Sequence, residues 1–582
     1  MAAALLESRR RLIAVALTLF LAALAPAGLA SQLPTSEEVR SERSSRGMVV
    51  SEFALASQVG RDVLAAGGNA VDAAIATGLA LAVTHPTAGN IGGGGFMVIR
   101  FPDGRATALD FREKAPLASH AEMFVEGGEY SSRRHHNSYV AVGVPGTVAG
   151  FDKAHRLYGS TQWERLVYPA VALAEDGFPL TERLAESLAN FVSGKGGEFP
   201  ATVQAFSKSG TPYREGEVFK QPDLARTLTR IMQDRRDGFY AGETARLLAE
   251  EMSRGGGIIS ERDLEVYQAK ERTPVVGEYK GYQVISMPPP SSGGVALVEM
   301  LNILEGYDLA AMGHNSPRYL HHLAEAMRRA FRDRARYLAD QDFVDVPVHR
   351  LTSESHASEL RLEIDPTRAS ASSVEDVAAV AAAQSWESPE TTHYSVVDAD
   401  GMAVSVTYTL EQGFGTGITV TGAGFLLNNE MGDFNARPGL TTEEGLIGTN
   451  ANLARPEQRM LSSMSPAILA RDGQLVGVVG SPGGRTIINT VLQLVLNRVD
   501  FQLPPEEIVR AGRMHHQWLP DRIVIEEGAI SQEEAAVLEA MGHTVLVRGS
   551  QGRANSIFVD PRTRELVGVP DVRSPDSGAA GS

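Results

Sequence analysis

The chain has 582 residues, of which 43% are hydrophobic and 21% charged, a balance typical of a globular protein. At about 100–200 residues per domain, this length allows three or four domains or one large α/β unit. The net charge of −17 disfavours a nucleic-acid partner or an anionic membrane surface. There is no cysteine, which excludes disulfides, thiol catalysis and Cys-ligated zinc.

The first thirty residues have the three parts of a secretory signal peptide. Three arginines at 9–11 precede an apolar run, Leu12–Leu24, and a small-residue site ends at Ala30. The run is shorter than the roughly 20 residues that span a bilayer comfortably. An uncleaved membrane anchor is the alternative interpretation. We predict that residues 1–30 are removed, leaving a periplasmic or secreted protein without a stable membrane anchor.

Two helices are predicted after a polar leader. Helical periodicity covers Ala54–Ala66 and ends at the glycine pair 67–68, a common C-terminal signal. Asn69 or Ala70 then begins a second helix, Val71–Val83. Because this helix is apolar on nearly all sides, we expect it to be buried.

A glycine-rich segment, Gly89–Gly95, leads into the predicted strand FMVIRF. Phosphate binding would need a following helix and a Gly-Lys-Ser/Thr sequence, and both are missing. The glycines instead predict a tight crossing of the backbone. Arg112 follows in DFREKAP, where a solvated charge is the usual fate of an arginine.

The middle of the chain is predicted to be mainly helical. VGVPGTVAGF (142–151) is typical of a turn that begins a buried helix, and residues 160–280 are mostly helical in pattern. GYQVISMPPPSSGG predicts a strand, a rigid turn at 288–290 and a helix beginning near Ser291. Residues 321–340 predict an amphipathic helix whose histidines lie on its surface and bind no metal.

The chain changes character at residues 369–390. Alanine and serine dominate this segment, which predicts a flexible linker. It ends at Thr391, and the two strand-like segments TTHYSVV and MAVSVTYTL follow. The linker therefore leads directly into a predicted hairpin.

The hairpin has a predicted three-residue loop, Ala399–Gly401, with glycine in the left-handed position. In that register Thr392, Tyr394 and Val396 lie on an apolar face. Thr391, His393 and Ser395 lie on a polar face, as a half-buried sheet requires. The same register sets the Thr409 hydroxyl directly opposite Thr391. Since β-branched residues suit strands, pattern alone leaves Thr391 as either an ordinary strand residue or a nucleophile.

Two later segments carry further polar groups. LSSMSP precedes the predicted strand AILARDG, and SPGG lies between the strand LVGVVG and the apolar helix TIINTVLQLVLNRV. A glycine pair at such a turn offers backbone N–H groups at a helix N-terminus. That suits an oxyanion hole or an anion site, and a simple tight turn is the alternative.

Together these segments resemble the γ-glutamyltransferases, which are N-terminal-nucleophile (Ntn) hydrolases. The resemblance runs from GGNAVDAAIA and GNIGGGGFMV through DFREKAP, PPPSSGG, TTHYSVVD, TYTL, FGTGI, LLNNEMGDF, LSSMSP and SPGG. It implies an α+β fold, a four-layer αββα sandwich with two central antiparallel sheets flanked by helices. It also implies an inactive precursor that is cleaved into segments 31–390 and 391–582, which form one αββα unit as a heterodimer.

The resemblance implies a reaction without metal or cofactor. The Thr391 hydroxyl attacks the carbonyl of Glu390, and water then releases the two chains. The new α-amine of Thr391 acts as general base, and the hydroxyl attacks a γ-glutamyl amide such as that of glutathione. Thr409 matches the second threonine that tunes the nucleophile, and Gly483 and Gly484 match the oxyanion hole. Water then gives hydrolysis, and an amino-acid or peptide amine gives transfer.

Substrate-binding residues are implied in the same way. Arg112, Ser462 and Ser463 match groups that hold the substrate α-carboxylate, and a guanidinium suits that task through its bidentate geometry. Glu430 and Asp433 match acceptors for the substrate α-ammonium. These side chains should converge on one small zwitterion.

This chain departs from the family pattern in two places. Glu411 stands where many relatives have Asn; it can still accept from the ammonium, but it adds negative charge. The segment 438–458 matches the family's lid over the pocket and contains no aromatic residue, whereas some relatives have a tyrosine there.

Two other functions remain as alternatives. The first is an acylase for glutaryl or cephalosporin-type side chains, but a glutaryl group has no α-amine to satisfy Glu430 and Asp433. The second is an uncut, non-enzymatic protein that binds γ-glutamyl peptides. The retained pair Thr391 and Thr409 argues against the second.

Overall fold

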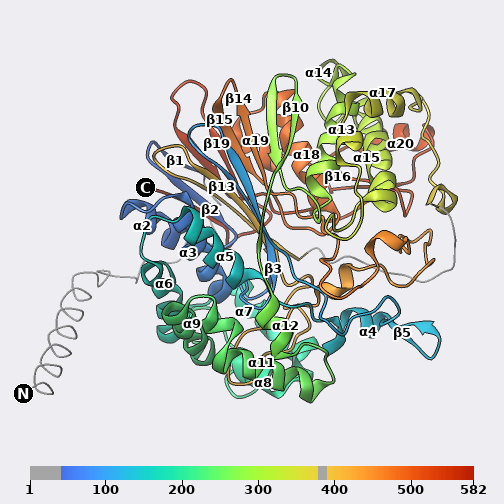
Figure 1. Ribbon diagram of the computed structural model, residues 1–582. Coiled ribbons are helices and arrows are strands. Elements are labelled where there is room, and N and C mark those ends of the chain that lie inside the picture. Colours follow the sequence, from blue (N-terminus) through green and yellow to red (C-terminus); the bar gives the residue numbers. More distant parts are fainter. Residues whose placement is uncertain (1–40, 378–389) are drawn as a thin grey trace, which may run out of the picture. The chain divides into compact units, whose positions relative to one another are not determined.

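The computed structural model describes residues 41–377 and 390–582 (Figure 1). The predicted signal peptide and most of the predicted linker, 378–389, lie outside the described residues. No helix in these two ranges is long and apolar enough to cross a membrane.

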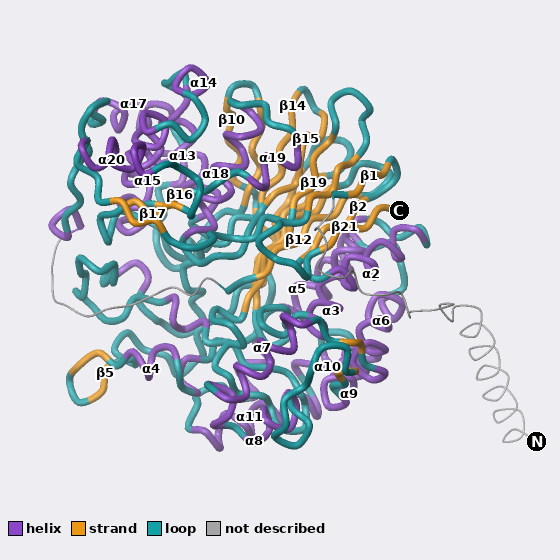
Figure 2. The backbone as a smooth tube through the Cα atoms, turned by 180° about the vertical axis from the view of Figure 1, so that it is seen from behind, coloured by secondary structure: helices purple, strands orange, loops and turns teal. Residues whose placement is uncertain are grey.

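Two seven-stranded antiparallel sheets lie face to face with helices outside them, so the predicted αββα sandwich is confirmed. Figure 2 shows the strands of both sheets from behind, with helices beside them. The first sheet has the order β1 (Glu42–Ser44), β20 (Leu566–Val569), β19 (Ser556–Val559), β15 (Gln474–Val479), β14 (Ala467–Arg471), β11 (Tyr282–Ser286), β10 (Val275–Tyr279).

The second sheet carries the predicted hairpin at its centre. Its order is β21 (Gly578–Gly581), β2 (Met48–Ser51), β12 (Thr392–Val397), β13 (Ala403–Thr409), β3 (Gly94–Arg100), β4 (Ala106–Phe111), β9 (Lys270–Arg272). Each sheet combines strands from before and after Thr391. Neither segment therefore has a sheet of its own.

Three small sheets and several 3-10 turns lie outside the two large sheets. The small strands are β5 (Val125–Glu126) with β6 (Glu129–Tyr130), β7 (Phe178–Pro179) with β8 (Val218–Phe219), and β16 (Met514–His515), β17 (Ile523–Ile525) and β18 (Val545–Val547). The 3-10 turns are Tyr139–Ala141, Lys195–Glu198, Val374–Val377, Glu430–Asp433 and Asn450–Asn452.

Helices cover the outer face of each sheet. Helices α2, α3 and α5 pack on the second sheet, while α13 and α18 pack with the first (Figure 1). The first group and its neighbours are α2 (Ala54–Ala65), α3 (Ala70–Thr84), α4 (Ser132–His136), α5 (Thr147–Tyr158), α6 (Trp163–Asp176), α7 (Glu182–Ser193), α8 (Pro200–Phe206), α9 (Pro222–Asp234), α10 (Asp237–Tyr240), α11 (Gly242–Gly255) and α12 (Glu261–Val266).

The second group contains the helices that pack with the first sheet and their neighbours. It comprises α13 (Gly293–Glu305), α14 (Leu309–Met312), α15 (Pro317–Tyr337), α16 (Val348–Leu351), α17 (Glu354–Leu362), α18 (Thr486–Val499), α19 (Pro505–Arg510) and α20 (Gln532–Ala540). The predicted boundaries of α2, α3 and α18 agree with these within one residue. Asn69 caps α3 through its side chain, and α3 is buried throughout, as its composition predicted.

The hairpin has the predicted register but not the predicted exposure. His393 lies opposite Thr407 and Tyr394 opposite Val406, and Gly401 takes a φ of +86° in the loop. Both strands are fully buried, so the half-buried sheet was wrong. The polar face meets the first sheet, where Ser395 Oγ donates to the carbonyl of Asn555 at 2.8 Å.

The glycine-rich segment is the predicted close crossing. A Cβ on Gly93 would lie 2.0 Å from the carbonyl oxygen of Thr409, and one on Gly95 would lie 2.4 Å from Tyr408 Cβ. Only glycine lets β3 approach β13 at this point. The segment thereby fixes the strand end that carries Thr409.

Two predictions about α15 and the linker need correction. His321 and His322 are buried, not on the helix surface, because the chain around His543 and Asp365 packs against this face of α15. The described start of the linker, 369–377, makes specific contacts: Ser370 Oγ donates to Glu325, and Val374 is buried. The segment has few large apolar residues, which is why it was predicted to be flexible. Its serines instead form hydrogen bonds with the buried charged residues Glu325 and Arg328.

Candidate active site

Thr391 and Thr409 meet where β12 begins and β13 ends. Thr391 Oγ1 lies 2.7 Å from the carbonyl oxygen of Glu390 and 3.2 Å from Thr409 Oγ1. Thr409 Oγ1 lies 3.3 Å from the same carbonyl oxygen and accepts the backbone N–H of Glu411 at 2.9 Å. The predicted register therefore brings two buried hydroxyls onto the carbonyl that precedes Thr391.

Gly483 and Gly484 form the predicted turn between β15 and α18. Their φ values are +136° and +56°, which favour glycine at both positions, and a Cβ on Gly483 would lie 2.4 Å from Thr486 Oγ1. Among the described residues, neither glycine N–H donates to another backbone group. Two N–H groups near a helix N-terminus can stabilise a developing oxyanion.

A cavity of about 290 Å³ joins the predicted residues. Most of the lining residues come from the sequence analysis, and only Met464 and Ile487 are new. The lining comprises Arg112, Thr391, Thr409, Glu411, Glu430, Asp433, Ser462, Ser463, Met464, Gly484 and Ile487. Gly483 lies beside this cavity in the chain without lining it.

Arg112 is fully buried, so the ordinary expectation of a solvated charge is wrong. It follows the end of β4, and its guanidinium donates to Glu430 through one nitrogen and to Asp433 through another. The carbonyls of Met460 and Leu461 accept from it at 3.4 and 3.3 Å. The three charged groups converge, and Arg112 pairs with both carboxylates.

Carboxyl groups outnumber the guanidinium around Arg112. Glu113 lies 3.7 Å from Arg112, and burial raises the pKa of Glu113 to about 8. Burial also raises the pKa of Glu430 well above its usual value, although Arg112 acts in the opposite direction. An added ammonium would relieve this excess of acid. Sequence reasoning missed Glu113, although it stands next to Arg112 in DFREKAP.

The two serines are held by the turn before α13. Ser462 exchanges backbone hydrogen bonds with this turn, donating to the carbonyl of Pro290 at 3.0 Å and accepting from Ser292 at 2.7 Å. Arg334 of α15 donates to Ser463 Oγ at 3.0 Å and to Ser292 Oγ at 2.9 Å. Sequence reasoning missed Arg334, and the only signal in the sequence is the series of arginines in α15.

Glu411 has a strained backbone. Its φ is +78°, a conformation that glycine and asparagine adopt more readily than glutamate. Its side chain is buried in the cavity wall, and Oε1 lies 4.0 Å from Nδ1 of His136. The backbone at this position therefore suits asparagine better than glutamate.

The predicted lid segment lies beside the cavity. Leu446, Ile447 and Thr449 line an adjoining cavity of about 540 Å³, which also touches Asp433. Arg485 ties the segment to the start of α18 by donating to the carbonyl of Gly445 at 3.1 Å. No residue of 438–458 lines the smaller cavity, so the segment contacts only the adjoining one.

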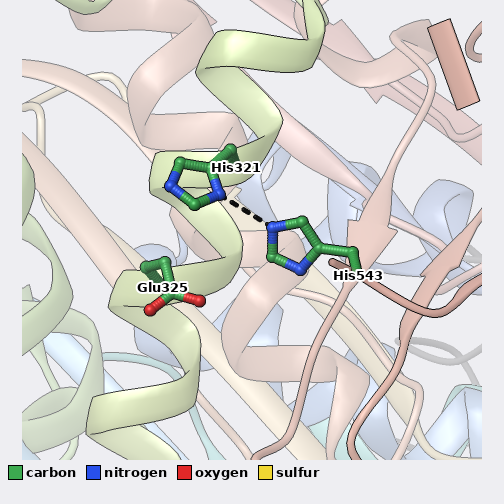
Figure 3. A group of neighbouring side chains, drawn as sticks. All are labelled: His321, Glu325 and His543. Carbon is green, nitrogen blue, oxygen red and sulfur yellow. Dashed lines mark hydrogen bonds between the residues drawn. The ribbon is translucent and has the colours of Figure 1, made fainter. Parts of the chain in front are cut away.

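Three buried side chains away from this cavity are close enough to share a metal ion: His321, Glu325 and His543 (Figure 3). His321 Nε2 donates to the carbonyl of Asp365, so its Nδ1 accepts from Nε2 of His543, each at 2.8 Å. Glu325 accepts from Arg329 at 2.7 Å. These contacts occupy the atoms that a metal would need.

Glu299, Asp333 and His356 form a second buried group of this kind. His356 Nε2 lies 2.7 Å from Asp333 Oδ2, and burial raises the pKa of Glu299 well above its usual value. A protonated Glu299 lowers the negative charge of the group without a metal. We interpret it as support between α13, α15 and α17.

The chain matches known proteins along nearly its whole length. The family model described as Gamma-glutamyltranspeptidase matches residues 56–581. The Glutathione hydrolase proenzyme of Escherichia coli (strain K12) is 47% identical over 540 residues, which cover 93% of this chain and 92% of that protein.

Two solved structures are similar in fold. Cephalosporin acylase from Bacillus halodurans has a TM-score of 0.82 and 27% identity, covering 95% of this chain and 98% of that one. Helicobacter pylori gamma-glutamyltranspeptidase has a TM-score of 0.53 and 45% identity, covering 54% of this chain and 91% of that one.

Proposed function

Because this chain belongs to the gamma-glutamyltranspeptidase family, we propose that it is a self-cleaving γ-glutamyltransferase and glutathione hydrolase with Thr391 as its nucleophile. One observation carries the proposal. Thr391 Oγ1 lies 2.7 Å from the carbonyl oxygen of Glu390, with Thr409 Oγ1 in contact with both. A hydroxyl held beside its own preceding carbonyl is suited to an intramolecular acyl shift.

Self-cleavage proceeds through an ester. Thr391 Oγ1 attacks the carbonyl carbon of Glu390, and the hydroxyl proton passes to the nitrogen of Thr391 as the C–N bond breaks. Water then adds to the ester, and breaking of its C–O bond leaves a carboxylate on Glu390 and restores the Thr391 hydroxyl. Thr409, which contacts both reacting groups, orients the hydroxyl.

The cleaved enzyme uses the new terminus as its base. An α-amine has a reference pKa of about 7.7–8.0, so near neutral pH a useful fraction of it is unprotonated and can take the hydroxyl proton. Thr391 Oγ1 attacks the γ-glutamyl carbonyl, and the N–H groups of Gly483 and Gly484 hold the oxyanion. The leaving amine takes the proton, and water or an acceptor amine resolves the acyl-enzyme.

Recognition of the γ-glutamyl group uses the acid-rich surroundings of Arg112. The substrate α-carboxylate binds Arg112 with Ser462 and Ser463, and the α-ammonium binds Glu430 and Asp433. The ammonium supplies the positive charge that the buried carboxyl groups lack. Ion pairs inside the site are then exchanged for ion pairs with substrate, so little net charge is buried without a partner.

An acylase is the second candidate, since a cephalosporin acylase has the similar fold described above. A glutaryl side chain carries one carboxylate and no ammonium, so it would add a negative charge beside Glu430 and Asp433. That charge balance favours the γ-glutamyl substrate. An uncut binding protein is disfavoured because two threonine hydroxyls lie on the scissile carbonyl.

The proposal extends to location and assembly. Residues 1–30 act as a signal peptide, and the mature protein is periplasmic or secreted. Residues 31–390 and 391–582 stay together as a heterodimer after cleavage, because both segments contribute strands to each sheet. Its small-molecule partners are γ-glutamyl donors such as glutathione, with amino acids or peptides as acceptors.

A denaturing gel of wild type beside Thr391→Ala tests the proposal. Wild type should give two bands split before Thr391, and the variant one band. A single uncut and inactive wild-type band would overturn the enzyme assignment. Turnover of γ-glutamyl anilide against glutaryl anilide then separates the two candidate reactions, and faster glutaryl turnover would favour the acylase.

A further inference from the structure

Arg553 contacts the residues on both sides of the bond that the chain is proposed to cut. Its Nη2 donates to the side-chain carboxylate of Glu390 at 2.9 Å and lies 3.5 Å from the carbonyl oxygen of Thr391. Neither Glu390 nor Arg553 lines the cavity that contains Arg112. A guanidinium therefore stands next to the nucleophile, outside the γ-glutamyl site.

Arg553 is held in place without help from Glu390. Its Nε lies 2.6 Å from the buried carboxylate of Glu52, whose other oxygen accepts from Asn555 at 2.7 Å. Its backbone N–H donates to Ser481 Oγ at 3.0 Å, in the same SPGG segment as the proposed oxyanion hole. The position of the guanidinium is thus fixed by the fold and not by the residue that departs on cleavage.

In self-cleavage Glu390 is the acyl group and the amine of Thr391 leaves, but Glu390 lies outside the cavity proposed to hold the γ-glutamyl chain. The same Oγ1 attacks the Glu390 carbonyl during self-cleavage and the γ-glutamyl carbonyl during turnover, so the two carbonyls occupy the same place. The γ-glutamyl chain runs from there into the cavity toward Arg112. The remaining direction, which the uncut chain fills with Glu390, is left for the leaving amine or the acceptor.

We propose that Arg553 is a carboxylate-binding residue used twice: it holds Glu390 during self-cleavage, and it then binds the carboxylate of the leaving peptide or of the acceptor. This inference rests on the proposed function. The side-chain carboxylate of Glu390 marks the position that the ligand carboxylate would take. The substrate class is γ-glutamyl peptides with a free C-terminal carboxylate, together with amino-acid or peptide acceptors that carry one.

Arg553 should bind a ligand carboxylate because cleavage lets Glu390 move away from its guanidinium. Glu52 still faces Nε, but Nη2 loses its charged acceptor in a largely buried position, where an unpaired donor is costly. A substrate carboxylate restores that hydrogen bond with full charge assistance. Neutral leaving groups cannot do so and should bind less well.

Self-cleavage is the first readout. Full-length Arg553→Met and Glu390→Gln should each cleave more slowly than wild type by about 10-fold, the effect of losing one charged hydrogen bond. Arg553→Lys should cleave at an intermediate rate. Arg562→Met, which removes an exposed arginine of the same segment, is the matched control and should cleave like wild type. Wild-type rates in both Arg553→Met and Glu390→Gln would overturn the first use.

Discrimination between substrates is the second readout. Cleaved wild type should turn over a γ-glutamyl anilide with a ring carboxylate with kcat/KM about 10-fold above the uncharged anilide, and Arg553→Met should bring that ratio close to one. Wild type alone gives a parallel test: a dipeptide acceptor should have a lower KM than its C-terminal amide. Equal values for both pairs in wild type would overturn the second use.

These outcomes separate the inference from the function on which it rests. If wild type turned over neither anilide, the γ-glutamyltransferase assignment itself would fail. If wild type turned over the carboxylated and the uncharged anilide equally well, the γ-glutamyltransferase assignment would stand and only the proposed role of Arg553 would fail. Should Arg553→Met fail to fold, as its melting temperature would reveal, the Glu390→Gln cleavage rate and the wild-type acceptor pair still decide both uses.

Discussion

Arg112 and Glu430, which are 318 positions apart in the sequence, form an ion pair in which both side chains are almost fully buried. Arg112 follows β4 in the second sheet, and Glu430 lies in a 3-10 turn beyond the hairpin. Together with Asp433 they connect the two segments on either side of Thr391. The site is therefore held together by the same charges that are proposed to bind substrate.

Arg112→Gln should damage both binding and stability. Removing one partner of a buried ion pair leaves uncompensated charge, and we expect a loss of about 3–5 kcal/mol in the free energy of unfolding. KM for a γ-glutamyl anilide should rise at least about 100-fold, because charged hydrogen bonds to the substrate are lost. Chemical denaturation and steady-state kinetics measure the two effects.

The double variant Arg112→Gln with Glu430→Gln separates the effect on stability from the effect on substrate binding. It removes both charges of the pair, so stability should recover in part while KM stays high. Full recovery of KM in the double variant would contradict a role for Arg112 in substrate binding.

Thr409→Ala should slow self-cleavage without unfolding the protein. The Thr409 hydroxyl contacts both Thr391 Oγ1 and the scissile carbonyl, and loss of such an orienting contact should cost about 10- to 100-fold in rate. A time course on a denaturing gel measures this. Thr407→Ala is the matched control in the same strand: its hydroxyl pairs with His393, so it should lower stability and spare the cleavage rate.

Glu411→Asn should stabilise the protein. Asparagine tolerates the left-handed backbone at this position, and the change also removes one carboxylate from the acid-rich site. We expect a gain of about 0.5–1 kcal/mol, measured as a higher melting temperature. Glu411→Gln removes the charge but keeps the strain; if it stabilised as much as Asn, backbone strain would not be the cause.

Glu113 should make stability fall as pH rises. Its pKa is raised to about 8 in the folded protein from an ordinary value of 4.5, so between these values the folded state holds a proton that the unfolded state has released. The free energy of unfolding therefore declines from about pH 4.5 to pH 8. Denaturation of wild type and Glu113→Gln across this range measures it. If the free energy of unfolding fell with pH as steeply in Glu113→Gln as in wild type, a group other than Glu113 would cause the decline.

Gly93→Ala should prevent correct placement of Thr409. The new Cβ would overlap the carbonyl oxygen of Thr409, and backbone on both sides has little room to move. We expect at least about 1–3 kcal/mol of destabilisation and little self-cleavage. Gly477→Ala is a milder strand control, since its Cβ would come no closer than 3.0 Å to Phe558. Normal cleavage in Gly93→Ala would contradict the close-crossing argument.

The sequence predicted what depends on local pattern. The hairpin register followed from alternation and a three-residue loop, and α18 followed from its periodic apolar residues. The residues lining the cavity came from motif resemblance, since pattern alone left Thr391 undecided. Their roles in binding and catalysis stay predictions.

The parts that sequence could not give depend on long-range packing. The polar face of the hairpin is buried because the other large sheet covers it, and that sheet is assembled from strands distant in the sequence. Arg553 carried no motif, and only the fold brings it to Glu390. His321 was misplaced because helix periodicity does not reveal what packs on the polar side.

The mixing of strands from both segments in each sheet has a kinetic consequence. The uncut chain folds as one molecule, and its folding rate does not depend on protein concentration. After the proposed cut before Thr391, the same sheets can be rebuilt only from two separate polypeptides, so refolding becomes a second-order reaction that dilution slows. The active form would then owe its lifetime to slow unfolding, while the precursor is the form from which the architecture is readily made.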